Sequence, residues 1–71
     1  MNVRYYFFNC LDNLFMVKRD LKKLHPRLMI AEDILHLVLT VESKNEASFD
    51  DEICSLIQNN GGQLLDKKPQ Y

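Results

Sequence analysis

The stretch Ile34-Leu35-His36-Leu37-Val38-Leu39-Thr40-Val41-Glu42 decides the fold, because its apolar residues follow the two-residue period of a β-strand. One side of this period is wholly aliphatic and is formed by Leu35, Leu37, Leu39 and Val41. The other side is mixed and holds Ile34, His36, Val38, Thr40 and Glu42. We therefore predict a strand over residues 34–42 at the centre of a small sheet, with the aliphatic face packed on helices and the mixed face open or half-covered by a partner. The alternative is a buried helix over residues 26–41, with Pro26 at its first position.

The length of the chain, 71 residues, allows one domain (residues 1–71) with one hydrophobic core. A chain this short buries only about 60% of the surface that its unfolded form exposes, so we expect marginal stability and reinforcement by self-association. The formal net charge of −1 argues against a general nucleic-acid binder. No apolar run approaches the roughly 20 residues that cross a bilayer, and Asn9 and Asp12 interrupt the aromatic run near the N-terminus. We expect a soluble, cytoplasmic protein without membrane partners.

Two further segments flank the central stretch on its N-terminal side. Residues 3–11 predict a strand that belongs inside the sheet, covered on both sides, because both of its faces are apolar or aromatic. One face holds Val3, Tyr5 and Phe7, and the other holds Arg4, Tyr6, Phe8 and Cys10. Residues 13–25 predict a helix that ends near His25, before Pro26. Its apolar face is formed by Leu14, Val17, Leu21 and Leu24, with Phe15 at the margin.

The remaining elements are predicted from shorter signals. Residues 27–31 form either a short strand or a helical segment, and Glu32-Asp33 is a poor two-residue turn, so a bulged or longer connection is expected. Ser48 is expected to cap a second helix together with Asp51. Its apolar face holds Phe49, Ile53, Leu56 and Ile57. The sequence Asn59-Asn60-Gly61-Gly62 ends this helix, and residues 63–67 predict an edge strand.

The order of these elements predicts an α+β fold, the ferredoxin-like split βαβ (βαββαβ) sandwich, with a small antiparallel sheet and two helices on one face. In that topology the first and third strands are the central pair. In element order the whole chain resembles ferredoxin-like regulatory modules such as the ACT domain. The resemblance implies a small effector near the turn between the first strand and first helix, where this chain has Asp12-Asn13, and subunits that pair through sheets or helices.

No group of residues has the spacing of a catalytic, cofactor or metal site. Cys10, Cys54, His25 and His36 lie far apart in the sequence and form neither a C-x-x-C nor an H-x-x-x-H pair. We expect both cysteines to be reduced, partly buried thiols with a packing role. The acidic residues 50–52 suit the first turn of a helix. A small enzyme with Cys10 or Cys54 as nucleophile is the least favoured hypothesis.

Two surfaces are the candidate sites. Self-association is expected through the mixed face of the central strand, formed by His36, Val38 and Thr40. The basic face of the first helix either is solvated or docks an acidic protein or a nucleic acid, and it holds Lys18, Arg19, Lys22, Lys23 and Arg27. We therefore predict a non-enzymatic interaction or regulatory domain that self-associates through its sheet, with binding of nucleic acid or an acidic partner as the alternative.

Overall fold

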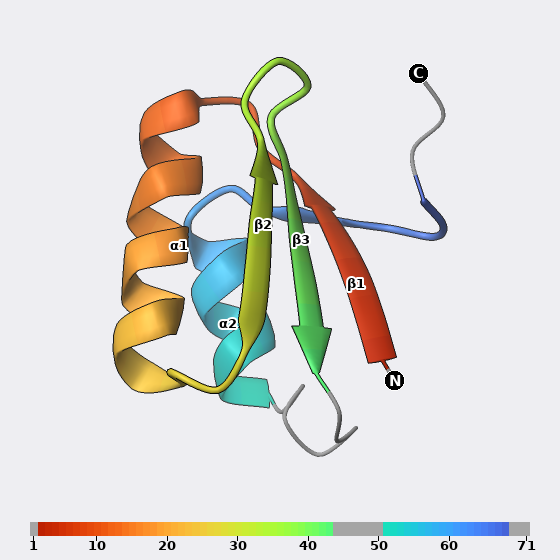
Figure 1. The fold of residues 1–71 in the computed structure, drawn as a ribbon. Helices are drawn as coiled ribbons and strands as arrows, with labels where there is room; N and C mark the ends of the chain where they lie inside the picture. The colour runs from red at the N-terminus through yellow and green to blue at the C-terminus, as the bar shows by residue number, and fades with distance from the viewer. Residues whose placement is uncertain (1, 44–50, 69–71) are drawn as a thin grey trace.

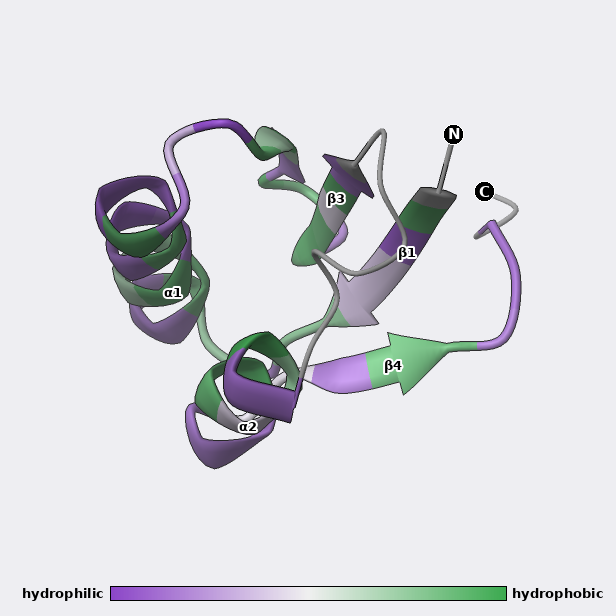
Figure 2. Ribbon diagram, turned by 90° about the horizontal axis from the view of Figure 1, so that it is seen from below, coloured by the Kyte–Doolittle hydropathy of each residue, from purple (hydrophilic) through white to green (hydrophobic). Residues whose placement is uncertain are grey.

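The structure is a computed structural model that describes residues 2–43 and 51–68. The described residues form an α+β fold, in which a four-stranded antiparallel sheet packs against two helices (Figure 1). The elements are β1 (Asn2–Phe7), α1 (Leu11–Leu24), β2 (Met29–Asp33), β3 (Val38–Ser43), α2 (Asp51–Asn59) and β4 (Gln63–Leu65). The strand order is β2-β3-β1-β4, so β1 and β3 are central. Both helices lie on one side of the sheet (Figure 2).

The hydrophobic core lies between the sheet and the helices. In the sheet, Tyr6 of β1 lies opposite Leu39 of β3, and both are almost fully buried. Val41 is also buried, as is Phe8, just beyond the end of β1. The helices and the loop after α1 supply the rest of the buried cluster, namely Leu14, Val17, Leu21, Leu28, Ile53 and Ile57.

The prediction of a strand over residues 34–42 is wrong in its first half, because residues 34–37 form the turn between β2 and β3. Leu35 is 90% exposed, while Leu39 and Val41 reach the core. The reason is local hydrogen bonding. The Asp33 carboxylate accepts the His36 backbone N–H at 3.2 Å and lies 2.9 Å from His36 Nδ1, which ends β2 at Asp33.

Leu37 completes this turn with a φ of 56°, which is the left-handed region. Its carbonyl accepts the Phe8 backbone N–H at 2.8 Å, and its side chain packs against the core. The alternative helix over residues 26–41 is wrong, because β2, the turn and β3 occupy this segment. Of the two alternatives for residues 27–31 the strand is correct, but β2 covers residues 29–33, so Glu32 and Asp33 lie in the strand and not in the turn. The connection is residues 34–37, which is longer than a two-residue turn, as expected.

Helix α1 is present where the helical spacing of apolar residues predicted it. Its first residue and the burial of its last apolar residue differ from the prediction. It begins at Leu11, after Cys10, which has no side-chain capping bond. It ends at Leu24, and the His25 N–H donates to the Leu21 carbonyl at 2.7 Å, as expected for a stop before Pro26. Leu24, predicted to be in the core, is 54% exposed, because the chain turns away after this last helical residue and Leu28 returns to the core.

Helix α2 ends as predicted, in a glycine-containing cap. The Gly62 N–H donates to the Ile57 carbonyl at 2.8 Å, and the Gly61 N–H donates to the Gln58 carbonyl at 3.1 Å. Gly61 has a φ of +85°, as the Schellman motif requires. The buried Ile53 and Ile57 and the partly buried Leu56 confirm the predicted face. The expected cap at Ser48 and the expected face position of Phe49 lie outside the described residues.

The two strands on the β4 side of the sheet are shorter than predicted. Strand β1 ends at Phe7 instead of Leu11, because the chain must turn into α1. Strand β4 has three residues, and the chain leaves the sheet at Asp66. The prediction that β1 is covered on both sides is also wrong. Both described helices cover the same side, and Val3 on the other side is 38% exposed.

Candidate functional site

The side of the sheet away from the helices is formed by alternate residues of the strands. Side chains alternate between the two faces of a strand, and directly opposed residues share a face. Tyr5 lies opposite Thr40 of β3 and Leu65 of β4, and Thr40 lies opposite Ala31 of β2. The resulting set, called the open face below, is Met29, Ala31, Asp33, Val38, Thr40, Glu42, Val3, Tyr5, Phe7, Gln63 and Leu65.

The open face is apolar at its centre and charged at its ends. Met29, which lies opposite Glu42 at one end, is 57% exposed, whereas Val38 is buried. The two carboxylates, Asp33 and Glu42, lie at opposite ends of the β2–β3 pair. Among the described residues, no helix or strand covers this face (Figure 2). An apolar centre with a polar margin is the composition that protein–protein interfaces share.

The structure brings together only part of the predicted association site. Val38 and Thr40 lie on the open face, next to Phe7 and Tyr5 of β1. His36 does not belong to it, because it lies in the turn and contacts Asp33. Sequence reasoning missed Met29 and Ala31, since the strand that carries them was ambiguous. It did group Val3, Tyr5 and Phe7, but expected them to be covered.

The predicted basic face of α1 is partly neutralised. The Lys18 ammonium lies 2.7 Å from the Glu32 carboxylate, and both side chains are about three-quarters buried. Arg19 Nε lies 3.5 Å from the Asp20 carboxylate. Lys22, Lys23 and Arg27 are exposed. Lys18 therefore ties α1 to β2, and the five predicted residues do not form one continuous track of exposed cations.

A cluster of three polar groups lies between β1 and α2. Arg4 Nη1 donates to Cys54 Sγ at 3.4 Å. The Tyr6 hydroxyl is buried and forms no hydrogen bond of standard geometry, although it is close enough to Arg4 to raise the pKa of the guanidinium. Burial raises the pKa of Tyr6 itself, against the opposing effect of Arg4. These three side chains fill the helix side of the sheet beside Val41, so packing is enough to explain why they lie together.

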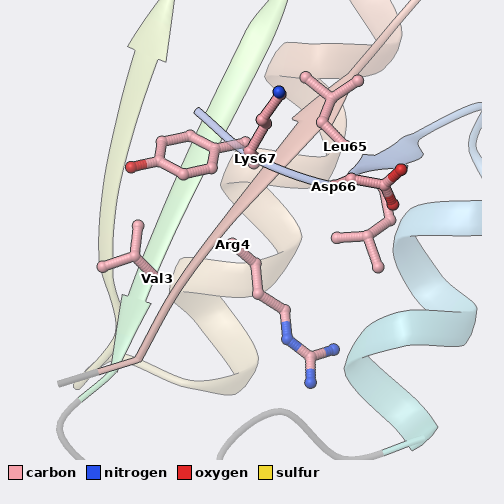
Figure 3. Close-up of a pocket in the computed structure, with 7 residues that line it drawn as sticks. Val3, Arg4, Leu65, Asp66 and Lys67 are labelled. Carbon is pink, nitrogen blue, oxygen red and sulfur yellow. The ribbon is translucent and has the colours of Figure 1, made fainter. Parts of the chain in front are cut away.

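A shallow pocket of about 350 Å³ lies where the chain leaves β4. Its lining comes from β1, from β4 and from the two residues that follow β4 (Figure 3). In the close-up, Arg4 points from β1 toward α2, while Asp66 and Lys67 lie where the chain has left the sheet. The lining residues are Val3, Arg4, Tyr5, Leu64, Leu65, Asp66 and Lys67. The pocket is open, and its lining combines apolar side chains with two cations and one carboxylate.

The cysteines are both free, and the expectation that both are partly buried is wrong for Cys10. Cys10 is exposed at the start of α1, because β1 ends before it, whereas Cys54 is partly buried. Within residues 2–43 and 51–68, no three His, Cys, Asp or Glu side chains come together as metal ligands. Over the same residues, no helix has the length and apolar character of a membrane span.

The effector position implied by the ACT resemblance also changes. Asp12 and Asn13 lie inside the first turn of α1, so the connection from β1 to α1 consists of residues 8–10. No protein-family model, curated protein or solved structure matches the chain.

Proposed function

We propose that the chain is a non-enzymatic interaction domain that self-associates through its open face, with two copies packed sheet against sheet. One observation carries this proposal. The open face combines apolar and aromatic side chains, among them the exposed Val3 and Met29 and the half-buried Tyr5, with only two carboxylates, one at each end of the β2–β3 pair. Sheets that pack face to face bury such alternate residues in a layer about 10 Å thick.

A second copy of the chain is the occupant that fits this surface. A two-fold dimer places the same patch on both subunits, so the apolar centres meet and the carboxylates remain at the margin. A standard interface buries about 800 Å² per partner, roughly a sixth of the 4974 Å² that the described chain exposes. Dimerisation would also add to the limited burial that a chain of this size achieves alone.

We infer that the chain is a ferredoxin-like split βαβ unit, which leaves one face of its sheet free for pairing. The element order, the antiparallel pairing and the central position of β1 and β3 support this topology. The strand bounds differ from those expected, most of all in β3 and β4.

The experiment is sedimentation of the wild type and two variants over micromolar to millimolar concentrations. Met29→Lys places a charge on the open face and should abolish dimerisation. Leu24→Lys is the matched control, because Leu24 has a similar exposure, 54% against 57%, but lies on α1 in the other layer. A wild type that stays monomeric, or equal loss of dimer in both variants, contradicts the proposal.

A further inference from the structure

A second interaction surface follows from the length of β4. Strand β4 pairs only with Tyr5, Tyr6 and Phe7 of β1. Among the described residues, the first half of β1 thus has a strand partner on one side only, namely β3. The pocket described above lies beside this half-paired segment. An exposed strand edge of this kind is a template for an added strand.

The register of β4 shows which side chains an added strand would meet. Leu65 lies opposite Tyr5, so the next residue in line with β4 would lie opposite Arg4, and the one after it opposite Val3. Arg4 is on the helix side of the sheet, where it contacts Cys54. Val3 is on the open face and is 38% exposed. An occupant therefore needs a side chain suited to a guanidinium, followed by an apolar one.

Charge selects the chemistry of the occupant. Two cations, Arg4 and Lys67, and one carboxylate, Asp66, line the pocket. A carboxylate in a strand opposite Arg4 forms a charge-assisted pair, whereas a lysine there meets like charge. Among the described residues the sheet ends at β2 on one side and at β4 on the other, and at the β2 edge the residue on the helix side, Glu32, is an acid that lies 2.7 Å from Lys18. Arg4 thus distinguishes the β1 edge from the β2 edge.

We propose that the half-paired edge of β1 beside Leu65, lined by Val3, Arg4 and Lys67, binds an extended peptide segment in which carboxylates alternate with apolar residues. The peptide adds to the sheet in line with β4. Its carboxylate lies opposite Arg4, and its apolar side chain lies over Val3. This site borders the open face, because Val3, Tyr5 and Leu65 belong to both, and peptide binding does not require dimerisation.

The test is an NMR titration with two eight-residue peptides, one alternating Asp with Val and the other alternating Lys with Val. The Asp peptide is expected to bind at least about tenfold more tightly, which corresponds to roughly 1.4 kcal/mol. Its binding should shift the amide signals of residues 2–5 and 64–67. It should also slow hydrogen exchange at those amides of residues 2–4 that point away from β3.

The Arg4→Glu variant makes the test decisive, since it should reverse the preference in favour of the Lys peptide. If that variant does not fold, Arg4→Gln replaces it and should remove the preference for Asp. Equal binding of both peptides, no binding, or signals that shift elsewhere would overturn the proposal. So would amides of residues 2–4 that are already protected in the free protein, because the chain's own Asp66 and Lys67 would then close the edge.

Discussion

Gly62 is required where α2 turns back toward the sheet, for a reason of space. A Cβ at Gly62 would overlap the Ile57 side chain and would lie 2.9 Å from both the Ile57 carbonyl oxygen and Phe8 Cζ. All three groups are inside the core or the helix cap, so they cannot move aside easily. Gly62→Ala should therefore lower the free energy of unfolding by about 1–3 kcal/mol in urea denaturation.

The neighbouring glycine provides the control for this prediction. Gly61 has a positive φ, but a Cβ there would make only an ordinary van der Waals contact, with Asn13 Nδ2 at 3.5 Å. Asn tolerates the left-handed region, so Gly61→Asn should cost well under 1 kcal/mol. If Gly62→Ala proves as mild as Gly61→Asn, the tight packing of Gly62 against Ile57 is not present in solution.

Tyr6 carries a prediction about alkaline pH. Burial raises its pKa above the usual value of 10.0, so the folded protein holds the phenolic proton where the unfolded chain releases it. The stability that this provides is complete below pH 10 and is lost as the pH rises through the folded-state pKa. The free energy of unfolding of the wild type should thus fall above pH 10 more steeply than that of Tyr6→Phe.

At neutral pH the same substitution should be tolerated. The Tyr6 hydroxyl is buried and forms no hydrogen bond of standard geometry. Its removal therefore breaks no strong hydrogen bond and removes a buried polar group. Tyr6→Phe should be as stable as the wild type or more stable by up to about 1 kcal/mol. A loss beyond 1 kcal/mol at pH 7, or parallel pH profiles of the two proteins, would show that the phenol has a better partner than Arg4.

The hairpin of β2 and β3 is the element whose interpretation changed most. If residues 34–37 are a turn, Leu35 contributes little to stability, whereas Leu39 is a core residue. Leu35→Gln should change the free energy of unfolding by less than about 0.5 kcal/mol. Leu39→Ala should lower it by about 2–5 kcal/mol. Comparable losses at both positions would instead indicate that Leu35 and Leu39 share one buried strand face.

This hairpin also shows what the sequence could and could not predict. The period of two correctly placed Leu39 and Val41 in the core, and the helical spacing correctly placed Leu14, Val17 and Leu21 there. The same alternation of apolar residues includes Leu35, although the backbone is not extended there. A side chain that bonds to the backbone three residues on, as Asp33 does to His36, competes with strand pairing without disturbing the hydropathy pattern.

The end of β1 and the length of β4 were hidden for a different reason. Phe8 is buried and continues the alternation of β1, but the paired strand has already ended at Phe7. Strand β4 ends where the chain bends at Asp66, and residues 63–67 contain no turn signal at that point. The pocket and the open edge of β1 depend on this bend, so neither could be predicted from composition or spacing.

For the whole molecule, the central feature is a sheet with helices on one side and an apolar surface on the other. The two faces of β1 and β3 were both recognisable from the sequence, since each strand carries apolar residues at odd and even positions. For β3 the sequence also predicted which face lacks a cover, since its aliphatic residues Leu39 and Val41 do lie in the core. For β1 it did not, because both of its faces are apolar or aromatic. The proposed association through the uncovered face would account for the apolar side chains on it.

The most direct measurement is an isotope-filtered NOE experiment on a mixture of labelled and unlabelled protein at millimolar concentration. Face-to-face dimerisation predicts intermolecular NOEs among the Met29 methyl, the Thr40 methyl and the Tyr5 ring, all on the open face. It also predicts none to exposed α1 residues such as Phe15 and Leu24. Intermolecular NOEs confined to α1, or none at all at millimolar concentration, would contradict self-association through the open face.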